Sequence, residues 1–221
     1  MKNKKRNILV RIGTGLMALA LTMLALMVLT AGCGVRADNR TAYEKIQEKL
    51  ISMETYEAEA DITYISNKNS HTYETKQQCR MSGEYRIEVT APERVAGNVT
   101  VCDGKTIAQF NERVAGKISV SANEAMERIE LFLTSFIKNY VRSQEVSIAV
   151  ANIDNEPCTV LEASIPGEHP YLRSEKLWVD NTTLKPVRLI IYDSNGSERI
   201  VVTYKSFEYN INLKDELFTI E

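Results

Sequence analysis

Strict alternation of apolar and polar residues begins at Tyr56, and it constrains the fold of this chain more than any other feature. Between positions 56 and 64 most even-numbered residues are apolar or aromatic, while Glu57, Glu59 and Asp61 occupy odd positions. A period of two indicates a strand with one face buried and the other face in water. The pattern therefore predicts a sheet that is covered on one face.

Similar segments follow along most of the chain and are separated by turn residues. Asp103-Gly104 and Asn195-Gly196 are strong hairpin signals, because these residue types accept the positive φ angles of tight turns. Strands joined by short turns form an antiparallel meander. The expected strands are 56–64, 71–80, 83–90, 97–102, 105–110, 114–120, 145–151, 157–165, 172–180, 185–193 and 198–209.

Two segments have helical spacing instead, and each begins with a capping box. The box from Thr41 to Glu44 opens a short amphipathic helix over 41–54, and the box from Ser121 to Glu124 opens a longer helix over 122–142. The longer helix has a broad apolar stripe that requires cover, most simply from the concave face of the sheet. The stripe comprises Ala125, Met126, Ile129, Phe132, Leu133, Phe136, Ile137 and Tyr140. About ten or eleven strands with two helices predict an antiparallel α+β domain.

The first 32 residues have the layout of an export signal. The first eleven contain five basic residues and no acid, and 12–32 carries no charge. The small residues Ala31 and Gly32 stand directly before Cys33, and a signal peptidase requires small side chains at the bond that it cuts. A membrane-spanning N-terminal helix is the alternative, since about 20 apolar residues can cross a bilayer.

The stretch from Leu29 to Cys33 resembles the lipobox of bacterial lipoproteins, with Thr30 in place of the usual leucine. The resemblance implies cleavage between Gly32 and Cys33 and attachment of diacylglycerol to the thiol. Two or three acyl chains, at about 0.8 kcal/mol per buried methylene, hold a protein on a membrane. We expect a signal peptide over 1–32, a lipidated tether over 33–40 and a single domain over 41–221.

Removal of the signal leaves 189 residues, enough for one domain with a substantial core. The remaining 22 basic and 29 acidic residues give the mature chain a net charge of minus 7. Outside the signal there is no cluster of Lys or Arg, which excludes nucleic-acid binding.

Three cysteines besides Cys33 are widely spaced: Cys79, Cys102 and Cys158. Only His71 and His169 could join them as ligands, so we expect no metal site and no cofactor. Three thiols cannot all pair with one another. One disulfide with a free thiol, or three buried thiols, are the alternatives, and burial is favoured because free cysteine behaves as a small apolar residue.

Three stretches together resemble the LolA/LolB superfamily. They are GEYRIEVTAPE from Gly83, VCDGKTIAQF from Val101 and the run from Leu177 to Ile220. The resemblance implies a LolA-like open antiparallel half β-barrel with helices on its concave face. In the carriers of this superfamily the barrel cavity holds acyl chains.

Among these proteins, an anchored acidic chain of this length is most similar to the germination lipoproteins of the GerS type in endospore-forming bacteria. This resemblance implies a non-catalytic accessory protein that supports a CwlD-type N-acetylmuramoyl-L-alanine amidase during modification of the spore cortex. It implies a location on the outer side of the cytoplasmic membrane, which in a spore former includes the space between forespore and mother cell. A lipid or lipoprotein carrier, or an envelope sensor, is the alternative.

Two patterns suggest catalysis, and each has a simpler explanation. Ser135 and Lys138 match the S-x-x-K motif of penicillin-recognising enzymes, but the companion S-D-N and K-T-G elements are missing. Glu57, Glu59 and Asp61 could supply the paired acids of a glycosidase, yet acids at every second residue also describe a solvated outer face. We therefore expect a protein that is not an enzyme.

Other polar and aromatic residues leave their roles open. His169 lies in a loop signal with no partner that the sequence identifies, which favours a solvated side chain. Four aromatic residues at strand spacing could line a ligand cavity or belong to the core: Trp178, Tyr192, Tyr204 and Phe207.

An unclosed barrel leaves edge strands whose free N–H and C=O groups can pair with a second copy. This predicts a symmetric homodimer. Exchange of the C-terminal segment from Glu198 to Glu221 is one way to build it.

Overall fold

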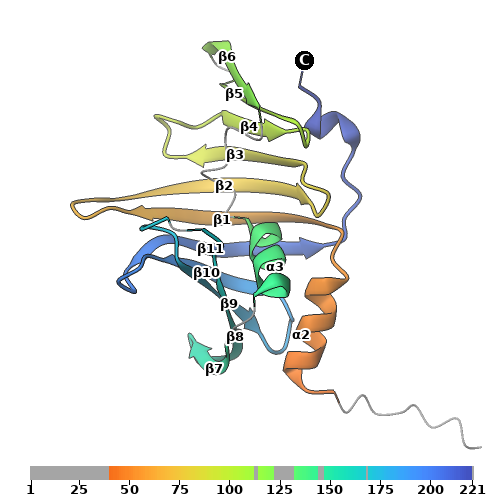
Figure 1. The fold of residues 1–221 in the computed structure, drawn as a ribbon. Helices are drawn as coiled ribbons and strands as arrows, with labels where there is room; N and C mark the ends of the chain where they lie inside the picture. The colour runs from red at the N-terminus through yellow and green to blue at the C-terminus, as the bar shows by residue number, and fades with distance from the viewer. Residues whose placement is uncertain (1–39, 112–113, 122–131, 144–146, 168, 221) are drawn as a thin grey trace, which may run out of the picture. The chain divides into compact units, whose positions relative to one another are not determined.

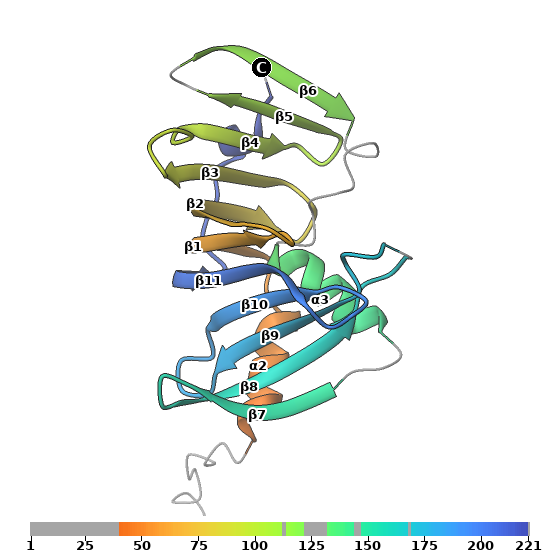
Figure 2. The same cartoon turned by 90° about the vertical axis from the view of Figure 1, so that its left-hand side faces the viewer.

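The computed structural model describes residues 40–111, 114–121, 132–143, 147–167 and 169–220. These residues form one antiparallel sheet of eleven strands with two helices packed on one face, called here the concave face (Figures 1 and 2). The α+β class and the strand number are as predicted. Gly32 and Cys33 lie outside the described residues. In the described ranges, no helix has the length and apolar character needed to cross a bilayer.

Two meanders build the sheet, and they meet where β1 pairs with β11. The spatial order of the strands is β6-β5-β4-β3-β2-β1-β11-β10-β9-β8-β7. Each predicted strand is present, with ends shifted by only a few residues. The strands are β1 (Thr55–Ile65), β2 (Ser70–Arg80), β3 (Tyr85–Ala91), β4 (Asn98–Cys102), β5 (Thr106–Asn111), β6 (Val114–Ser121), β7 (Ser147–Ile153), β8 (Glu156–Ser164), β9 (Ser174–Asp180), β10 (Pro186–Tyr192) and β11 (Glu198–Tyr209).

The first helix, α2 (Ala42–Ile51), begins with the predicted capping box. The Thr41 hydroxyl accepts from the Glu44 amide, and the Glu44 carboxylate accepts from the Thr41 amide at 2.7 Å. These two bonds satisfy end amides that a helix cannot pair internally. Ile46 and Leu50 are buried on one face of α2, as the apolar spacing predicts.

The second helix, α3 (Leu133–Arg142), is the described part of the predicted helix 122–142. The first half of that prediction, including its capping box and the stripe residues Ala125, Met126 and Ile129, lies outside the described residues. In the described half, Leu133, Phe136 and Ile137 are buried. The described part of the apolar stripe therefore packs on the sheet, as expected.

Both predicted hairpin turns are present, and an aspartate supports each. The Asp103 carboxylate accepts from the amides of Lys105 and Thr106 between β4 and β5. Between β10 and β11, the Asp193 carboxylate accepts from the amides of Asn195 and Ser197 in the same way. Such bonds from a side chain to the following backbone are typical of turns.

The main core lies between the concave face and the helices. It includes side chains from β1, β2 and β8 to β11, together with those of α2 and α3. On β1, the buried positions are Tyr56, Ala58, Ala60 and Ile62, which are the even-numbered residues of the predicted alternation. The period of the sequence therefore identifies the buried face of this strand correctly.

A smaller apolar cluster lies on the opposite, outer face of β3 to β5. Val99, Val101 and Ala108 are almost completely buried there, although they are not part of the main core. The C-terminal segment after β11 crosses to this region and ends in the short helix η2 (Asp215–Phe218), which contacts β3 and β4 (Figure 1). Phe218 is buried, so this segment is part of the folded domain.

The three cysteines of the domain are buried free thiols, as the favoured alternative predicts. Burial in an apolar environment disfavours a thiolate and raises the pKa of Cys79 to about 12. The pKa values of Cys102 and Cys158 are raised for the same main reason.

Candidate functional site: a cavity on the concave face

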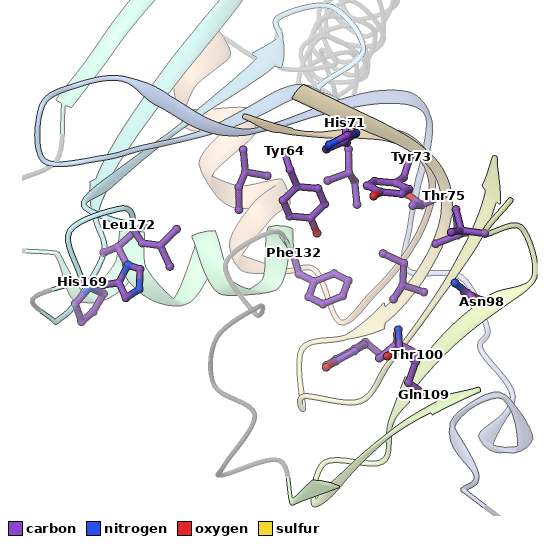
Figure 3. A pocket seen from close by; sticks show the side chains of 18 residues that line it. Tyr64, His71, Tyr73, Thr75, Asn98, Thr100, Gln109, Phe132, His169 and Leu172 are labelled. Carbon is purple, nitrogen blue, oxygen red and sulfur yellow. The ribbon is translucent and has the colours of Figure 1, made fainter. Parts of the chain in front are cut away.

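A cavity of about 730 Å³ opens on the concave face, beside the region that the helices cover. Its floor is formed by β2 to β5, and residues between β8 and β9, among them His169 and Leu172, form part of its other wall (Figure 3). A volume of this size lies in the range of pockets for small molecules. The cavity is therefore the first place to look for a ligand.

Strand pairing places the side chains of the floor in a fixed order. Ile87 on β3 stands opposite Thr100 on β4, and Thr100 stands opposite Gln109 on β5. On the neighbouring row, Thr75 of β2 stands opposite Val89 of β3. The floor consequently mixes branched apolar side chains with neutral polar side chains.

Aromatic side chains stand over this floor. Tyr64 and Tyr73 come from β1 and β2, and Phe132 immediately precedes α3 (Figure 3). The Phe132 ring is buried in the main core and closes the cavity on that side. Tyr85 also lines the cavity, and burial raises the pKa of its phenol. The phenol of Tyr85 is therefore a neutral hydroxyl at physiological pH.

The polar groups of the floor differ in how fully they are paired. The Thr75 hydroxyl donates to the Ala60 carbonyl oxygen at 2.9 Å. The Asn98 side-chain oxygen accepts from the Asn111 amide at 2.6 Å. Among the described residues, the hydroxyl of Thr100 and the amide of Gln109 have no hydrogen-bond partner, so both can bond to water or to a ligand.

Two histidines line the cavity from distant parts of the sequence. His71 comes from the start of β2 and His169 from the loop before β9, and both are exposed. The ring nitrogen Nδ1 of His169 accepts from the Tyr171 amide at 3.3 Å. The prediction of a solvated His169 is consistent with its exposure, but its position at the cavity wall was missed.

None of the eighteen described lining residues is Asp, Glu, Lys or Arg. In the described part of the chain, no group of three His, Cys, Asp or Glu residues is arranged to hold a metal ion.

The predicted acidic face lies away from this cavity. Glu57 and Asp61 are on the outer face of β1, where their charges are paired with lysines. Lys76 lies 3.2 Å from Glu57, and Lys205 lies 2.7 Å from Asp61. Glu59 is exposed on the same face. This is the solvated outer face that the simpler explanation predicts.

The S-x-x-K residues also lie apart from the cavity. Ser135 and Lys138 are on α3, one turn apart; Lys138 is exposed and neither residue lines the cavity. Within the described residues their side chains have no hydrogen bond to each other. The position of Lys138 on the solvent-facing side of α3 accounts for a lysine in this helix.

None of the four aromatic residues proposed from strand spacing lines the cavity. Tyr204 and Phe207 belong to the main core, where their rings pack edge to face at 5.5 Å. Trp178 lies on the face of β9 opposite to the buried Leu177, and Tyr192 lies beneath the ammonium group of Lys176 at 5.6 Å. The core interpretation is correct for Tyr204 and Phe207.

An open antiparallel sheet of this kind, with helices and a cavity on its concave face, defines the class of LolA-like half-barrel proteins. A family model described as "Sporulation protein YdcC-like" matches residues 15–218. The chain therefore belongs to the YdcC-like family of sporulation proteins.

Solved structures with a similar fold include an uncharacterized conserved protein from Thermus thermophilus. It is 11% identical, covers 80% of this chain and 93% of its own, and superposes with a TM-score of 0.51. The LolA superfamily protein NE2245 from Nitrosomonas europaea is 17% identical, with coverage of 81% and 96% and a TM-score of 0.44. A chain in the structure of the CwlD amidase from Clostridioides difficile in complex with the GerS lipoprotein is 25% identical, with coverage of 80% and 99% and a TM-score of 0.47.

A relative in sequence is the uncharacterized protein MJ0687 of Methanocaldococcus jannaschii. It is 23% identical over 197 residues, which are 85% of this chain and 52% of the relative. The chain thus spans about half the length of the curated relative that it matches.

Proposed function

We propose that this protein is a non-catalytic, lipid-anchored accessory protein that binds and supports a CwlD-type N-acetylmuramoyl-L-alanine amidase in sporulating cells. The observation that carries the proposal is the match of the YdcC-like sporulation family to residues 15–218. The resemblance of the sequence to germination lipoproteins supplies the partner.

The anchor is the acylated thiol of Cys33, on the outer side of the cytoplasmic membrane. Seven residues, 34–40, separate this anchor from the folded domain that begins at the capping box of Thr41. A tether raises the local concentration of whatever the domain holds near the membrane. The amidase is thereby kept close to its cell-wall substrate.

Support of an enzyme does not require a catalytic group from the accessory protein. A protein that binds one conformation of an amidase more tightly than another shifts the population toward that conformation, by no more than the difference between the two binding free energies. The contribution of this protein is binding energy, and the catalytic groups are those of the amidase.

The decisive experiment measures turnover of purified amidase on cortex-type glycan with and without the full-length protein in lipid nanodiscs. Empty nanodiscs are the control. We expect the protein to bind the amidase and to increase turnover. Absence of both binding and stimulation would reject the amidase role.

A second function, carriage of an apolar ligand such as an acyl chain, is favoured by the cavity on the concave face. The aliphatic and aromatic residues of its lining offer an apolar surface, and its volume suits such a ligand. Mass spectrometry of protein purified without added lipid tests this function. Stoichiometric lipid in addition to the covalent anchor would support it, and an empty cavity would count against it.

A further inference from the structure

The cavity on the concave face differs in one respect from a simple container for acyl chains. Four neutral polar side chains lie within its lining: Thr75, Asn98, Thr100 and Gln109. Thr75 and Asn98 already bond to other protein groups. A hydrocarbon chain that covered Thr100 and Gln109 would remove water from them without replacing its hydrogen bonds, and this leaves those two polar groups unpaired at a cost in free energy. The lining chemistry therefore favours a ligand that has hydrogen-bonding groups of its own.

The arrangement of these groups further limits the kinds of ligand that can match the cavity. Thr100 lies between Ile87 on one neighbouring strand and Gln109 on the other, so one aliphatic side chain stands beside two polar side chains along the row. Figure 3 shows Asn98, Thr100 and Gln109 gathered at one end of the cavity, with the Phe132 ring nearby. A matching ligand carries polar groups close to apolar faces.

Charge excludes several other classes of ligand. The eighteen described lining residues include no Lys or Arg to pair with a phosphate or carboxylate, and no Asp or Glu to pair with an amine. The two histidines among them, His71 and His169, are exposed to solvent. A buried charge without a partner is costly. Acidic peptides, phosphorylated molecules and polyamines therefore fit this lining poorly.

We propose that the cavity binds an uncharged chain of N-acetylated amino sugars. Sugar rings present C–H faces to the half-buried ring of Tyr73, while their hydroxyl and acetamido groups bond to Thr100 and Gln109. The acetyl methyl group packs against the aliphatic residues beside them, such as Ile87. This proposal deepens the amidase role, because it makes the protein a receptor for the glycan part of the amidase substrate.

The test is isothermal titration of the full-length protein in nanodiscs with chitotetraose, a neutral chain of four N-acetylglucosamine units. We expect saturable binding that is insensitive to salt, because no ion pair is involved. Thr100→Val removes one hydroxyl with little change in shape, and we expect it to weaken binding about tenfold. Gln109→Met changes an exposed residue, so its expected weakening does not depend on altered folding.

Thr203→Val is the matched control. Thr203 stands opposite Asp61 and Arg188 on the outer face of the sheet, so the same substitution there leaves the cavity unchanged. Affinity should equal that of the unmodified protein.

Palmitate, titrated in the same way, distinguishes the competing ligand. Binding of palmitate without binding of chitotetraose would overturn the proposal, and so would chitotetraose binding that Thr100→Val and Gln109→Met leave unchanged. The titration contains no amidase, so its outcome is separate from the outcome of the turnover experiment.

Discussion

Arg80, the last residue of β2, binds Asp215 near the C-terminus with 2.6 Å between Nη2 and Oδ1. The same nitrogen donates to the Leu213 carbonyl oxygen at 2.7 Å, and the guanidinium carbon lies 4.5 Å from the centre of the Phe218 ring. One side chain thus makes three contacts with the C-terminal segment. It fixes that segment over the outer apolar cluster of β3 to β5.

Arg80→Ala is expected to loosen this segment. It removes a bond to a backbone carbonyl and the packing on Phe218, so we expect a loss of about 1–3 kcal/mol in the free energy of unfolding. Hydrogen exchange over 213–219 should become faster. Arg94→Ala, at an exposed position, is the control and should leave both unchanged.

Asp215→Asn measures the contribution of the ion pair to stability apart from the other contacts of Arg80. The Asp215 side chain is 90% exposed, so solvent screens its charge and the expected loss is below about 1 kcal/mol. If Asp215→Asn were as damaging as Arg80→Ala in denaturant titrations, the ion pair would be the main interaction and our interpretation would be wrong.

Cys33→Ala is expected to release the protein from the membrane, because it removes the thiol that the lipobox resemblance assigns to acylation. In fractionated cells the variant should be absent from the membrane fraction. The intact mass of the wild-type protein should show an acylated Cys33. Cys158→Ala changes a buried thiol and should remain anchored. Unmodified Cys33 in protein extracted from membranes would exclude lipidation.

Cys79 is expected to resist alkylation in the folded protein. Its pKa is raised by burial from the ordinary value of 9.0 to about 12, which lowers the thiolate fraction near neutral pH about a thousandfold. Iodoacetamide labelling followed by peptide mapping measures the rate, and the denatured protein gives the reference. Equal rates in the folded and denatured states would contradict the burial of this thiol.

Stability is expected to fall at alkaline pH for the same reason. Below pH 9 the Cys79 thiol is neutral in both states, so it adds no pH dependence. Between pH 9 and about 12 the unfolded thiol ionises and the folded thiol does not, which favours unfolding by about 1.4 kcal/mol per pH unit. Urea titrations should show a shallower decline in Cys79→Ala, and an unchanged slope would contradict this assignment.

Self-association is predicted to occur through an exposed strand edge. β6 and β7 form the two edges of the sheet, and β7 exposes Ile148 and Val150 without any charged residue in the strand. Such an edge can pair with a second copy. Val150→Lys should reduce the mass measured by light scattering to that of a monomer. If the wild-type protein already has the mass of a monomer, no dimer forms and this prediction is wrong.

Exchange of the C-terminal strand is the other predicted route to a dimer. Within one chain, β11 lies at the centre of the sheet between β1 and β10. A dimer that persists in Val150→Lys would exclude pairing through β7 and leave exchange or pairing through the β6 edge. Transfer of the segment from Glu198 to Glu221 between copies, measured by mixing differently labelled protein, would then identify exchange.

Much of the fold could be predicted from local sequence pattern. The alternation after Tyr56, the turn dipeptides Asp103-Gly104 and Asn195-Gly196 and the capping box at Thr41 each act over a few residues. The physical preferences that they express are therefore readable along the chain, and the structure contains the corresponding elements at those positions.

The site depends on contacts between residues far apart in the sequence. The alternation of β2 places His71, Tyr73 and Thr75 on one face, but it does not say that Phe132 and His169 lie across the same cavity. The sequence also offered Trp178 and Tyr204 as lining residues, because spacing identifies a face of a strand without identifying what covers it.

The sequence by itself determined the order of strands and helices and the buried face of β1, because period and side-chain polarity decide these locally. It favoured three buried free thiols over one disulfide with a free thiol, and the structure decided between them. Only the tertiary structure decided that β1 pairs with β11, that Arg80 binds the C-terminal segment and that neutral polar side chains gather in one cavity. These features arise when pairing register and packing bring distant residues together, and no local preference encodes such distances.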